Sequence, residues 1–139
     1  MLRETNENPE LCFIVADLNG LKRTNDTLGH KAGDELIVGA SECISRAFEG
    51  CDGVFRIGGD EFCIIFSGPA EQAETCLARL DAMTAAWKGK YTDGISISSG
   101  LCSSREHPDL DSIIREADRR MYASKRDYYT KTGRDRRSG

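Results

Sequence analysis

The side chains best suited to chemistry are two adjacent acids, Asp60 and Glu61, which follow a pair of glycines inside a hydrophobic stretch. The flanking segments 54–57 and 62–66 are rich in β-branched and aromatic residues, which predicts two paired strands. We expect the glycines to supply the positive φ angles of a tight turn and to let a ligand approach the backbone. Adjacent carboxylates repel one another unless a cation neutralises them. The tip therefore predicts a site for a metal and a nucleotide, with an ordinary surface turn as the alternative.

A third acid, Asp17, ends the almost unbroken apolar run 11–16. Such a run is typical of a central strand buried on both faces. An unpaired carboxylate at the end of a buried strand is costly, but it is well placed to hold a hard cation. Asp17 is therefore the candidate residue that is hardest to explain by structure alone.

The segment after Asp17 offers groups for phosphate and for a base. Lys22 suits a phosphate, although lysines of this kind usually lie on the surface. Asn25 and Asp34 together match the hydrogen-bonding edge of guanine, because Asp accepts from N–H groups and Asn both donates and accepts. Asp34 could instead cap a helix, and His30 could be a helix-start residue satisfied by the backbone.

The elements that must position these residues follow from periodicity. The pattern predicts, in chain order, a strand over 11–16, a helix over 36–48, the hairpin, a helix over 69–87, a strand over 94–103 and a helix over 110–121. The apolar stripes, Trp87 included, are assigned to the core. The order β-α-β-β-α-β-α predicts an α+β fold, the ferredoxin-like βαββαβ sandwich with a central antiparallel sheet and an additional C-terminal helix.

Several motifs occur together, in a consistent order along nearly the whole chain. They are Asp17-Leu18-Asn19-Gly20-Leu21-Lys22, Asn25-Asp26, Gly29-His30, Gly33-Asp34, Arg56-Ile57-Gly58-Gly59-Asp60-Glu61-Phe62, Ser98-Ser99-Gly100, Ala117-Asp118 and Met121-Tyr122-Ala123-Ser124-Lys125. Together they resemble the GGDEF domain of bacterial diguanylate cyclases. The resemblance implies a fold of the nucleotidyl-cyclase and polymerase-palm type.

The resemblance also implies a reaction. Two GTP molecules would condense into cyclic di-GMP and two pyrophosphates, as each 3′-hydroxyl attacks the α-phosphate of the other nucleotide. Such a step requires positioning of the substrates, neutralisation of phosphate charge and activation of the hydroxyl. Two divalent cations in each active site, Mg²⁺ or Mn²⁺, are expected as cofactors.

The family's residue roles transfer to matching positions of this chain. The expected metal ligands are Asp17, the Leu18 carbonyl, Asp60 and Glu61. Either Asp60 or Glu61 would accept the hydroxyl proton, and the sequence leaves this choice open. The expected substrate-binding residues are Lys22 and Lys125 for phosphate, Asn25 and Asp34 for guanine, His30 close to the substrate, and Gly58 and Gly59 at the tip; Lys22 is also expected to assist catalysis.

The family's mechanism also sets the expected partners. Each subunit would bind one GTP, so turnover should need a homodimer with two facing half-sites. We expect the chain to be a single catalytic core cut from a longer protein with an upstream sensor domain. It lacks the Asp-x-Leu-Thr-x-Leu-x-Asn-Arg segment that usually precedes the family's first strand.

Two further positions depart from the family pattern. Asn19 stands where many members have a second aspartate, but the metal-binding position is the first, Asp17. After Lys125 the family often has a short glycine–arginine ending, whereas this chain continues with the segment 126–129, Arg-Asp-Tyr-Tyr. The second basic contact to phosphate is therefore unassigned.

The composition indicates a globular domain and argues against a nucleic-acid-binding or membrane-spanning protein. The 139 residues, 39% hydrophobic and 30% charged, predict one globular domain. The net charge of −4 argues against a nucleic-acid binder. There is no apolar run of the ~18 residues that a membrane span needs, so we expect no membrane contact by this domain and a cytoplasmic location, with the membrane anchoring of the parent left open. The six cysteines form no C-x-x-C pair, and buried free thiols are expected.

Other functions compete with the cyclase. The first alternative is a catalytically silent GTP-binding regulatory module, against which the complete set of hairpin acids argues. An RNA-recognition domain shares the βαββαβ order, but it needs exposed aromatic and basic residues on its central strands. A cyclase for ATP is disfavoured by Asp34, because adenine lacks the N1–H and N2–H₂ groups that a carboxylate would accept.

The family's inhibitory site for its product, R-x-x-D, has lost its arginine here, because the window before the hairpin reads Glu49-Gly50-Cys51-Asp52. We therefore predict no tight product feedback through this site. The check is a cyclase assay with added cyclic di-GMP. Micromolar inhibition that Asp52→Ala abolishes would contradict the prediction.

Overall fold

A single four-stranded antiparallel sheet organises the chain. The computed structural model describes residues 9–131. Its strands are β1 (Leu11–Leu18), β2 (Gly53–Arg56), β3 (Glu61–Ser67) and β4 (Ile97–Ser103), in the spatial order β2-β3-β1-β4. Each pair of neighbouring strands is antiparallel. This is the strand order of the predicted ferredoxin-like sandwich, and the fold class is confirmed.

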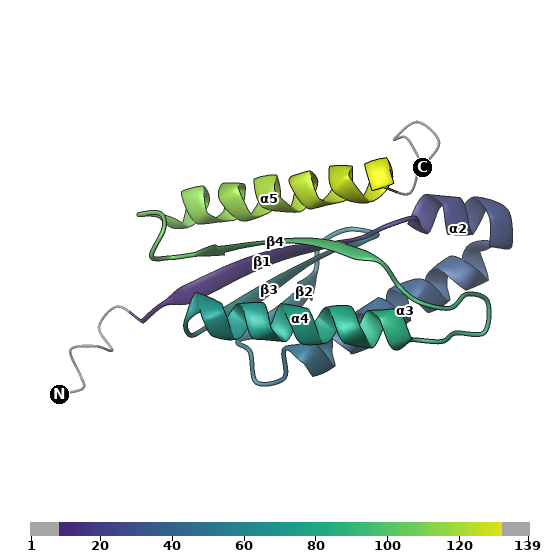
Figure 1. The fold of residues 1–139 in the computed structure, drawn as a ribbon, viewed down its shortest axis with the longest axis horizontal. Coiled ribbons are helices and arrows are strands. Elements are labelled where there is room, and N and C mark those ends of the chain that lie inside the picture. Colours follow the sequence, from purple (N-terminus) through teal and green to yellow (C-terminus); the bar gives the residue numbers. More distant parts are fainter. Residues whose placement is uncertain (1–8, 132–139) are drawn as a thin grey trace.

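The helices cover both faces of the sheet (Figure 1). They are α2 (Leu21–Leu28), α3 (His30–Ala47), α4 (Ala70–Ala86) and α5 (Leu110–Lys131). Figure 1 shows α3 and α4 on one face and α5 along the other, with α2 at the end of β1. Within residues 9–131, no helix combines the length and the apolar character that crossing a membrane requires.

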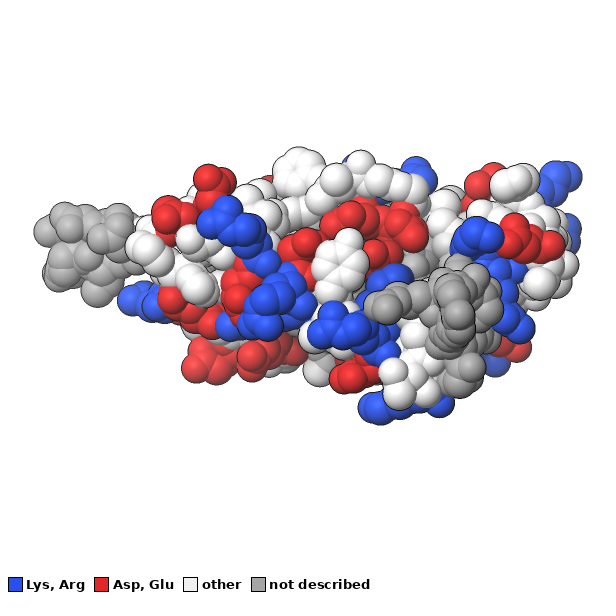
Figure 2. All heavy atoms as spheres, turned by 90° about the horizontal axis from the view of Figure 1, so that it is seen from above, with Lys and Arg blue, Asp and Glu red and all other residues white. Residues whose placement is uncertain are grey.

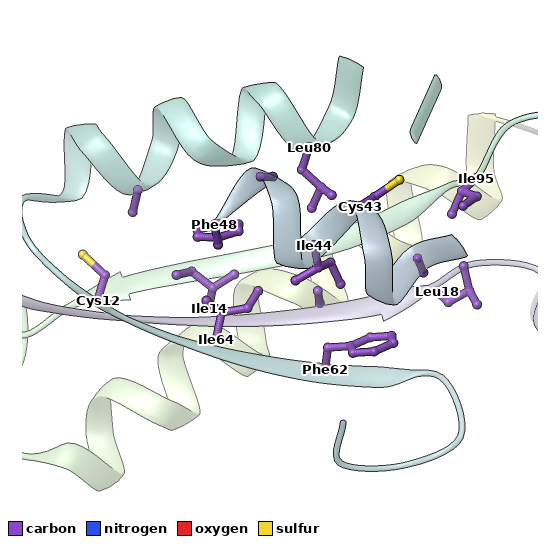
Figure 3. Close-up of a cluster of buried hydrophobic side chains, with 14 of the residues drawn as sticks. Cys12, Ile14, Leu18, Cys43, Ile44, Phe48, Phe62, Ile64, Leu80 and Ile95 are labelled. Carbon is purple, nitrogen blue, oxygen red and sulfur yellow. The ribbon is translucent and has the colours of Figure 1, made fainter. Parts of the chain in front are cut away.

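The larger core lies between the sheet and α3 and α4. Ile14, Ile44, Phe48, Phe62 and Leu80 are at most 2% exposed and pack together there (Figure 3). Burying each side chain of this size contributes about 1.5–3 kcal/mol. The α3 stripe forms because its apolar residues recur every three or four positions and so share one face.

A smaller core lies under α5. Ile113, Ala117 and Met121 recur every four residues and pack against Val15 and Cys102 on the opposite face of the sheet. Successive residues of β1 therefore alternate between two buried environments, which confirms the central strand predicted from its apolar run. The same alternation turns Asp17, two residues after Val15, towards the α5 face.

Four sequence predictions need correction. Helix α2 was not predicted, because its only hydrophobic residues are the two leucines at its ends and no apolar stripe marks it. The strand predicted from Gly94 begins only at Ile97, since Gly94 adopts a φ of 79° and the Ile95 N–H donates to the Thr84 carbonyl at the end of α4. All six cysteines are free, but Cys51 and Cys76 are only partly buried.

The fourth correction concerns the hairpin tip. The positive-φ glycines of the described chain do not include Gly58 or Gly59. A Cβ built on either glycine would meet no atom within 4 Å. Neither backbone conformation nor packing within the chain therefore requires glycine at these two positions.

Gly100 on β4 offers a test of this packing, because α5 approaches its backbone closely. A Cβ there would lie 2.1 Å from the Ala117 carbonyl oxygen and 2.4 Å from the Met121 nitrogen. Gly100→Ala should lower the free energy of unfolding by about 1–3 kcal/mol or more, the usual range for overpacking. Urea unfolding checks this, with Gly59→Ala as the matched control, expected within about 1 kcal/mol of the parent. Equal stability of the two variants would contradict the close approach of α5.

Candidate active site

The three candidate acids converge where β1 and β3 meet. In the register of these strands Asp17 lies directly opposite Glu61, and the Leu18 N–H donates to the Asp60 carbonyl at 2.8 Å. Directly opposed residues of antiparallel strands present their side chains on the same face, about 4.5–5.5 Å apart at Cβ. The pairing of two strands distant in sequence thus assembles the acidic centre that the sequence predicted.

Asp17 is the most unusual group of this centre. It is 8% exposed, and its buried Oδ1 has no hydrogen-bond partner among the described residues. Burial raises the pKa of Asp17 to about 6; the positive charge of Lys125 opposes this shift, and the negative charges of Asp60 and Glu61 add to it. The Lys125 ammonium, 3.3 Å from Oδ1, compensates this buried oxygen only in part, whereas native structures usually satisfy such an oxygen with hydrogen bonds.

The cluster of negative charges around Glu61 includes an acid of α5, Asp118. Burial raises the pKa of Glu61 first, and the negative charges of Asp118 and Asp60 raise it further. The pKa of Tyr122 is raised as well, chiefly by Asp118. Figure 2 shows the α5 side of the molecule, on which acidic side chains gather beside basic ones.

A pocket of about 390 Å³ opens beside the acids. It lies between the end of β1, the start of α2, the hairpin tip and the last turns of α5. Its lining residues are Leu18, Gly20, Leu21, Lys22, Asp60, Tyr122, Lys125, Arg126 and Tyr129. Three cations and a carboxylate thus face one space that is large enough for a small ligand.

Two lysines predicted for phosphate line this pocket, and each has an acidic partner. Lys22 is exposed and pairs with Asp26 one turn later on α2, at 3.1 Å. Lys125 is largely buried, and its ammonium lies 3.3 Å from Asp17 Oδ1. Arg126, which the sequence left unassigned, contributes a further cation to the lining.

The residues expected to contact guanine lie apart from the pocket lining. The Asn25 side chain packs against Gly33, where an added Cβ would lie 1.8 Å from Asn25 Oδ1. Asp34 is exposed inside α3, so the helix-cap alternative is wrong for it. His30 is the first residue of α3 and is also exposed. The α2–α3 pair thus brings Asn25 next to the residue before Asp34, but none of these three residues lines the pocket.

The hairpin tip is held by a side chain that sequence reasoning overlooked. The Arg56 guanidinium donates to the Gly58 carbonyl at 3.1 Å and to the Gly59 carbonyl at 3.0 Å. These bonds fix the two glycines from the strand that precedes them. The position of Arg56 immediately before the tip was the available signal.

A second overlooked group lies at the base of the site. Asn19 is 6% exposed and donates to the hydroxyls of Ser96 and Ser98, at 3.0 and 2.9 Å. Its Oδ1 accepts from Lys125 at 3.0 Å. Nothing in the local sequence could show that residues 106 positions apart meet here.

The donor set fits a hard divalent cation. Asp17 presents a buried oxygen without a donor, Asp60 lies at the pocket beside it, and carboxylate and carbonyl oxygens are what Mg²⁺ prefers. No group of three or more His, Cys, Asp or Glu side chains within residues 9–131 is arranged to hold a metal. A cation held by so few protein ligands would keep several water ligands, as Mg²⁺ usually does.

Comparison with known proteins identifies the family. The family model described as "Diguanylate cyclase, GGDEF domain" matches residues 1–131. The chain belongs to the GGDEF family. Diguanylate cyclase DgcS of Shewanella oneidensis is 30% identical over 123 residues, which cover 88% of this chain and 42% of DgcS. The chain thus spans less than half the length of this relative.

Solved GGDEF domains share the fold. The GGDEF domain of YfiN from Pseudomonas aeruginosa superimposes with a TM-score of 0.79 at 29% identity, covering 91% of this chain and 83% of that one. The GGDEF domain of DgcB from Caulobacter crescentus, solved in complex with c-di-GMP, gives a TM-score of 0.77 at 30% identity, covering 90% and 78%. Diguanylate cyclases of this family generally require a divalent metal.

The burial of Asp17 predicts a cost to stability in the absence of cations. Its pKa rises from 3.8 in the unfolded chain to about 6, so the charged form is disfavoured on folding. The cost is full above pH ~6 and vanishes below pH ~4. At about 1.4 kcal/mol per pKa unit, Asp17→Asn should raise the free energy of unfolding by roughly 2–3 kcal/mol at pH 8 in EDTA, and the gain should fade towards pH 4.

Chemical denaturation at several pH values measures this gain. Asp34→Asn, at an exposed position of α3, is the matched control and should change stability little. Added Mg²⁺ should stabilise the parent and not Asp17→Asn. If Asp17→Asn proves less stable than the parent at pH 8 in EDTA, the pair with Lys125 outweighs the burial of the carboxylate.

Proposed function

We propose that this GGDEF domain is a diguanylate cyclase that condenses two GTP molecules into cyclic di-GMP and two pyrophosphates. The observation that carries the proposal is the buried Asp17 oxygen without a donor, beside Asp60 and Glu61 and at the edge of a pocket lined by cations. Acids that the protein compensates only in part suit a metal, and cations across the same pocket suit phosphates. A metal-bound nucleoside triphosphate would supply the metal for the acids and the phosphates for the cations.

The glycines of the tip support a nucleotide at this place. Gly58 and Gly59 have neither positive φ nor a neighbour that would exclude a Cβ. A ligand at the tip would therefore meet bare backbone with open space above it. Arg56 holds the carbonyls of both glycines and so fixes the surface that the ligand would meet.

The acids of the site would bind the metal ions, and its basic residues would bind the phosphates. Asp17, Asp60 and the Leu18 carbonyl would hold two Mg²⁺ or Mn²⁺ ions, with Glu61 beside them. Bound cations stabilise the negative charge that develops on the transferring phosphoryl group. Lys22, Lys125 and Arg126 would hold the phosphates.

The proton of the attacking hydroxyl would pass to Glu61 or Asp60. Burial and neighbouring acids raise the pKa of Glu61, and a general base works best when its pKa lies near the operating pH. A cation bound beside it would lower that pKa again. Glu61 is therefore the first residue to test.

Guanine recognition would use the α2–α3 pair. Asn25 rests against Gly33, and Asp34 presents a free exposed carboxylate one residue further on, with His30 at the start of the same helix. An aspartate matches the N1–H and N2–H₂ of guanine and not the edge of adenine. A nucleotide with its phosphates in the pocket would lie along α2, so that its guanine base reaches these residues.

Turnover would require a homodimer. One pocket offers room for one nucleotide, and the reaction joins two, so the attacking hydroxyl must come from a second subunit facing the first. The relatives' greater length is consistent with an upstream domain that sets this geometry. The alternative function is a silent GTP-binding regulatory module, which would keep the pocket without turnover.

The deciding experiment is product analysis by mass spectrometry. The chain is fused to a dimerising coiled coil and incubated with GTP and Mg²⁺, beside Glu61→Gln and the control Glu42→Gln, an exposed acid on α3. We expect cyclic di-GMP from the parent and the control. Glu61→Gln should reduce the rate by about 10²-fold or more, the usual contribution of a general base.

The other outcomes separate the alternatives. Bound GTP without product in the parent favours the silent module. Comparable turnover of ATP contradicts the guanine-reading role of Asp34. Unchanged turnover in Glu61→Gln assigns the proton transfer to another group.

A further inference from the structure

Lys125 occupies an unexpected place for a residue assigned to phosphate. Its ammonium lies 3.3 Å from Asp17 Oδ1, the oxygen that has no hydrogen-bond partner, and its side chain is only 19% exposed. It thus approaches the acid expected to hold a metal. The contact joins the last turns of α5 to the end of β1.

Asn19 fixes the ammonium at this place. Its Nδ2 donates to Ser96 Oγ and Ser98 Oγ, so the amide cannot turn freely, and its backbone N–H donates to the Ser96 carbonyl at 2.8 Å. Its Oδ1 faces Lys125 at 3.0 Å. Because an ammonium only donates, the amide oxygen and not the nitrogen must face it.

A divalent cation bound to the Asp17 carboxylate would repel the Lys125 ammonium, which lies 3.3 Å from Oδ1. Like charges that share a carboxylate in a partly buried site repel strongly. Binding of the cation would therefore favour departure of the ammonium from the carboxylate. The ammonium would remain at the pocket, whose wall includes the Tyr129 ring at 5.6 Å from Lys125 Nζ.

We propose that Lys125 is the resident counter-cation of Asp17 in the metal-free protein, that Asn19 is the positioning residue that holds it there, and that a divalent cation displaces it towards the phosphate pocket. The lysine and the metal then compete for one carboxylate. Loading of the metal releases the ammonium to the space where a nucleotide's phosphates would lie. The proposal rests on the assignment of Asp17 to cation binding made above.

Binding of Mn²⁺ to the nucleotide-free chain tests this competition. The loss of the free Mn²⁺ signal in electron paramagnetic resonance gives the affinity without any turnover. Lys125→Met should bind Mn²⁺ about tenfold more tightly than the parent, because the competing charge is gone. Asn19→Ala should bind several-fold more tightly, because the ammonium loses its second acceptor.

Lys22→Met is the matched control. It removes an equal charge from the same pocket, but Lys22 pairs with Asp26 and not with Asp17. Its Mn²⁺ affinity should change by less than about twofold. Unchanged or weaker binding in Lys125→Met, or an equal gain in Lys22→Met, would overturn the proposal.

A second measurement needs no substitution at Lys125. The ε-methylene signal of Lys125 in a ¹H–¹³C spectrum should shift when Mg²⁺ is added to the parent without nucleotide, and should stay in place in Asp17→Asn. A signal that Mg²⁺ leaves unmoved in the parent contradicts the displacement. If Asp17→Asn binds Mn²⁺ as tightly as the parent, the cation assignment of Asp17 has itself failed.

Discussion

The pairing of β1 with β3 places Asp17 opposite Glu61, with Asp60 one residue further along the tip. Like charges directly opposed across antiparallel strands are destabilising. Here the repulsion coincides with burial, which raises the pKa of Asp17 and of Glu61. Buried acids with raised pKa values are typical of functional sites, where a ligand rather than the protein supplies the compensating positive charge. The rest of the fold holds these acids in register.

Both cores contribute to that register. The core under α3 and α4 fixes β1 and β3 through residues such as Ile14 and Phe62, and the core under α5 fixes β4 through Cys102 and the helix itself. Gly100 lets α5 approach β4 closely, which brings Lys125 over the end of β1. The position of one ammonium near one carboxylate thus depends on the close packing of α5 against β4. Precise placement of charges in active sites commonly depends on such rigid support.

The charge of Asp17 is compensated in part by other residues of the protein. Lys125 offsets some of the charge of Asp17, and Asn19 holds the ammonium through a buried network that ends on two serines of the β4 region. An asparagine at this position supplies an oxygen for the lysine without adding another negative charge. The departure from the family's second aspartate therefore has a physical consequence. It leaves Asp17 as the carboxylate that the Lys125 ammonium contacts.

Much of this protein follows from local sequence. The apolar run before Asp17, the helical stripes and the hairpin pattern predict the sheet and three of its helices, because hydrophobic periodicity reports which faces must be buried. The sequence also singled out Asp17, Asp60 and Glu61, and the pairing of β1 with β3 brings them together. Their role as metal ligands stays a prediction. Helix α2 was not predicted because it buries no residue, so its sequence shows no apolar stripe.

Tertiary structure alone decided the remaining features. The conformation of Gly58 and Gly59, the clamp from Arg56, and the meeting of Lys125 with Asp17 and Asn19 depend on contacts between residues far apart in the chain or on backbone angles that composition does not determine. Sequence fixes which side chains are available, because residue type sets charge and hydrogen-bonding capacity. Which of them satisfy one another is set by strand register and helix packing, and these place the Lys125 ammonium beside Asp17 Oδ1 as its ion-pair partner.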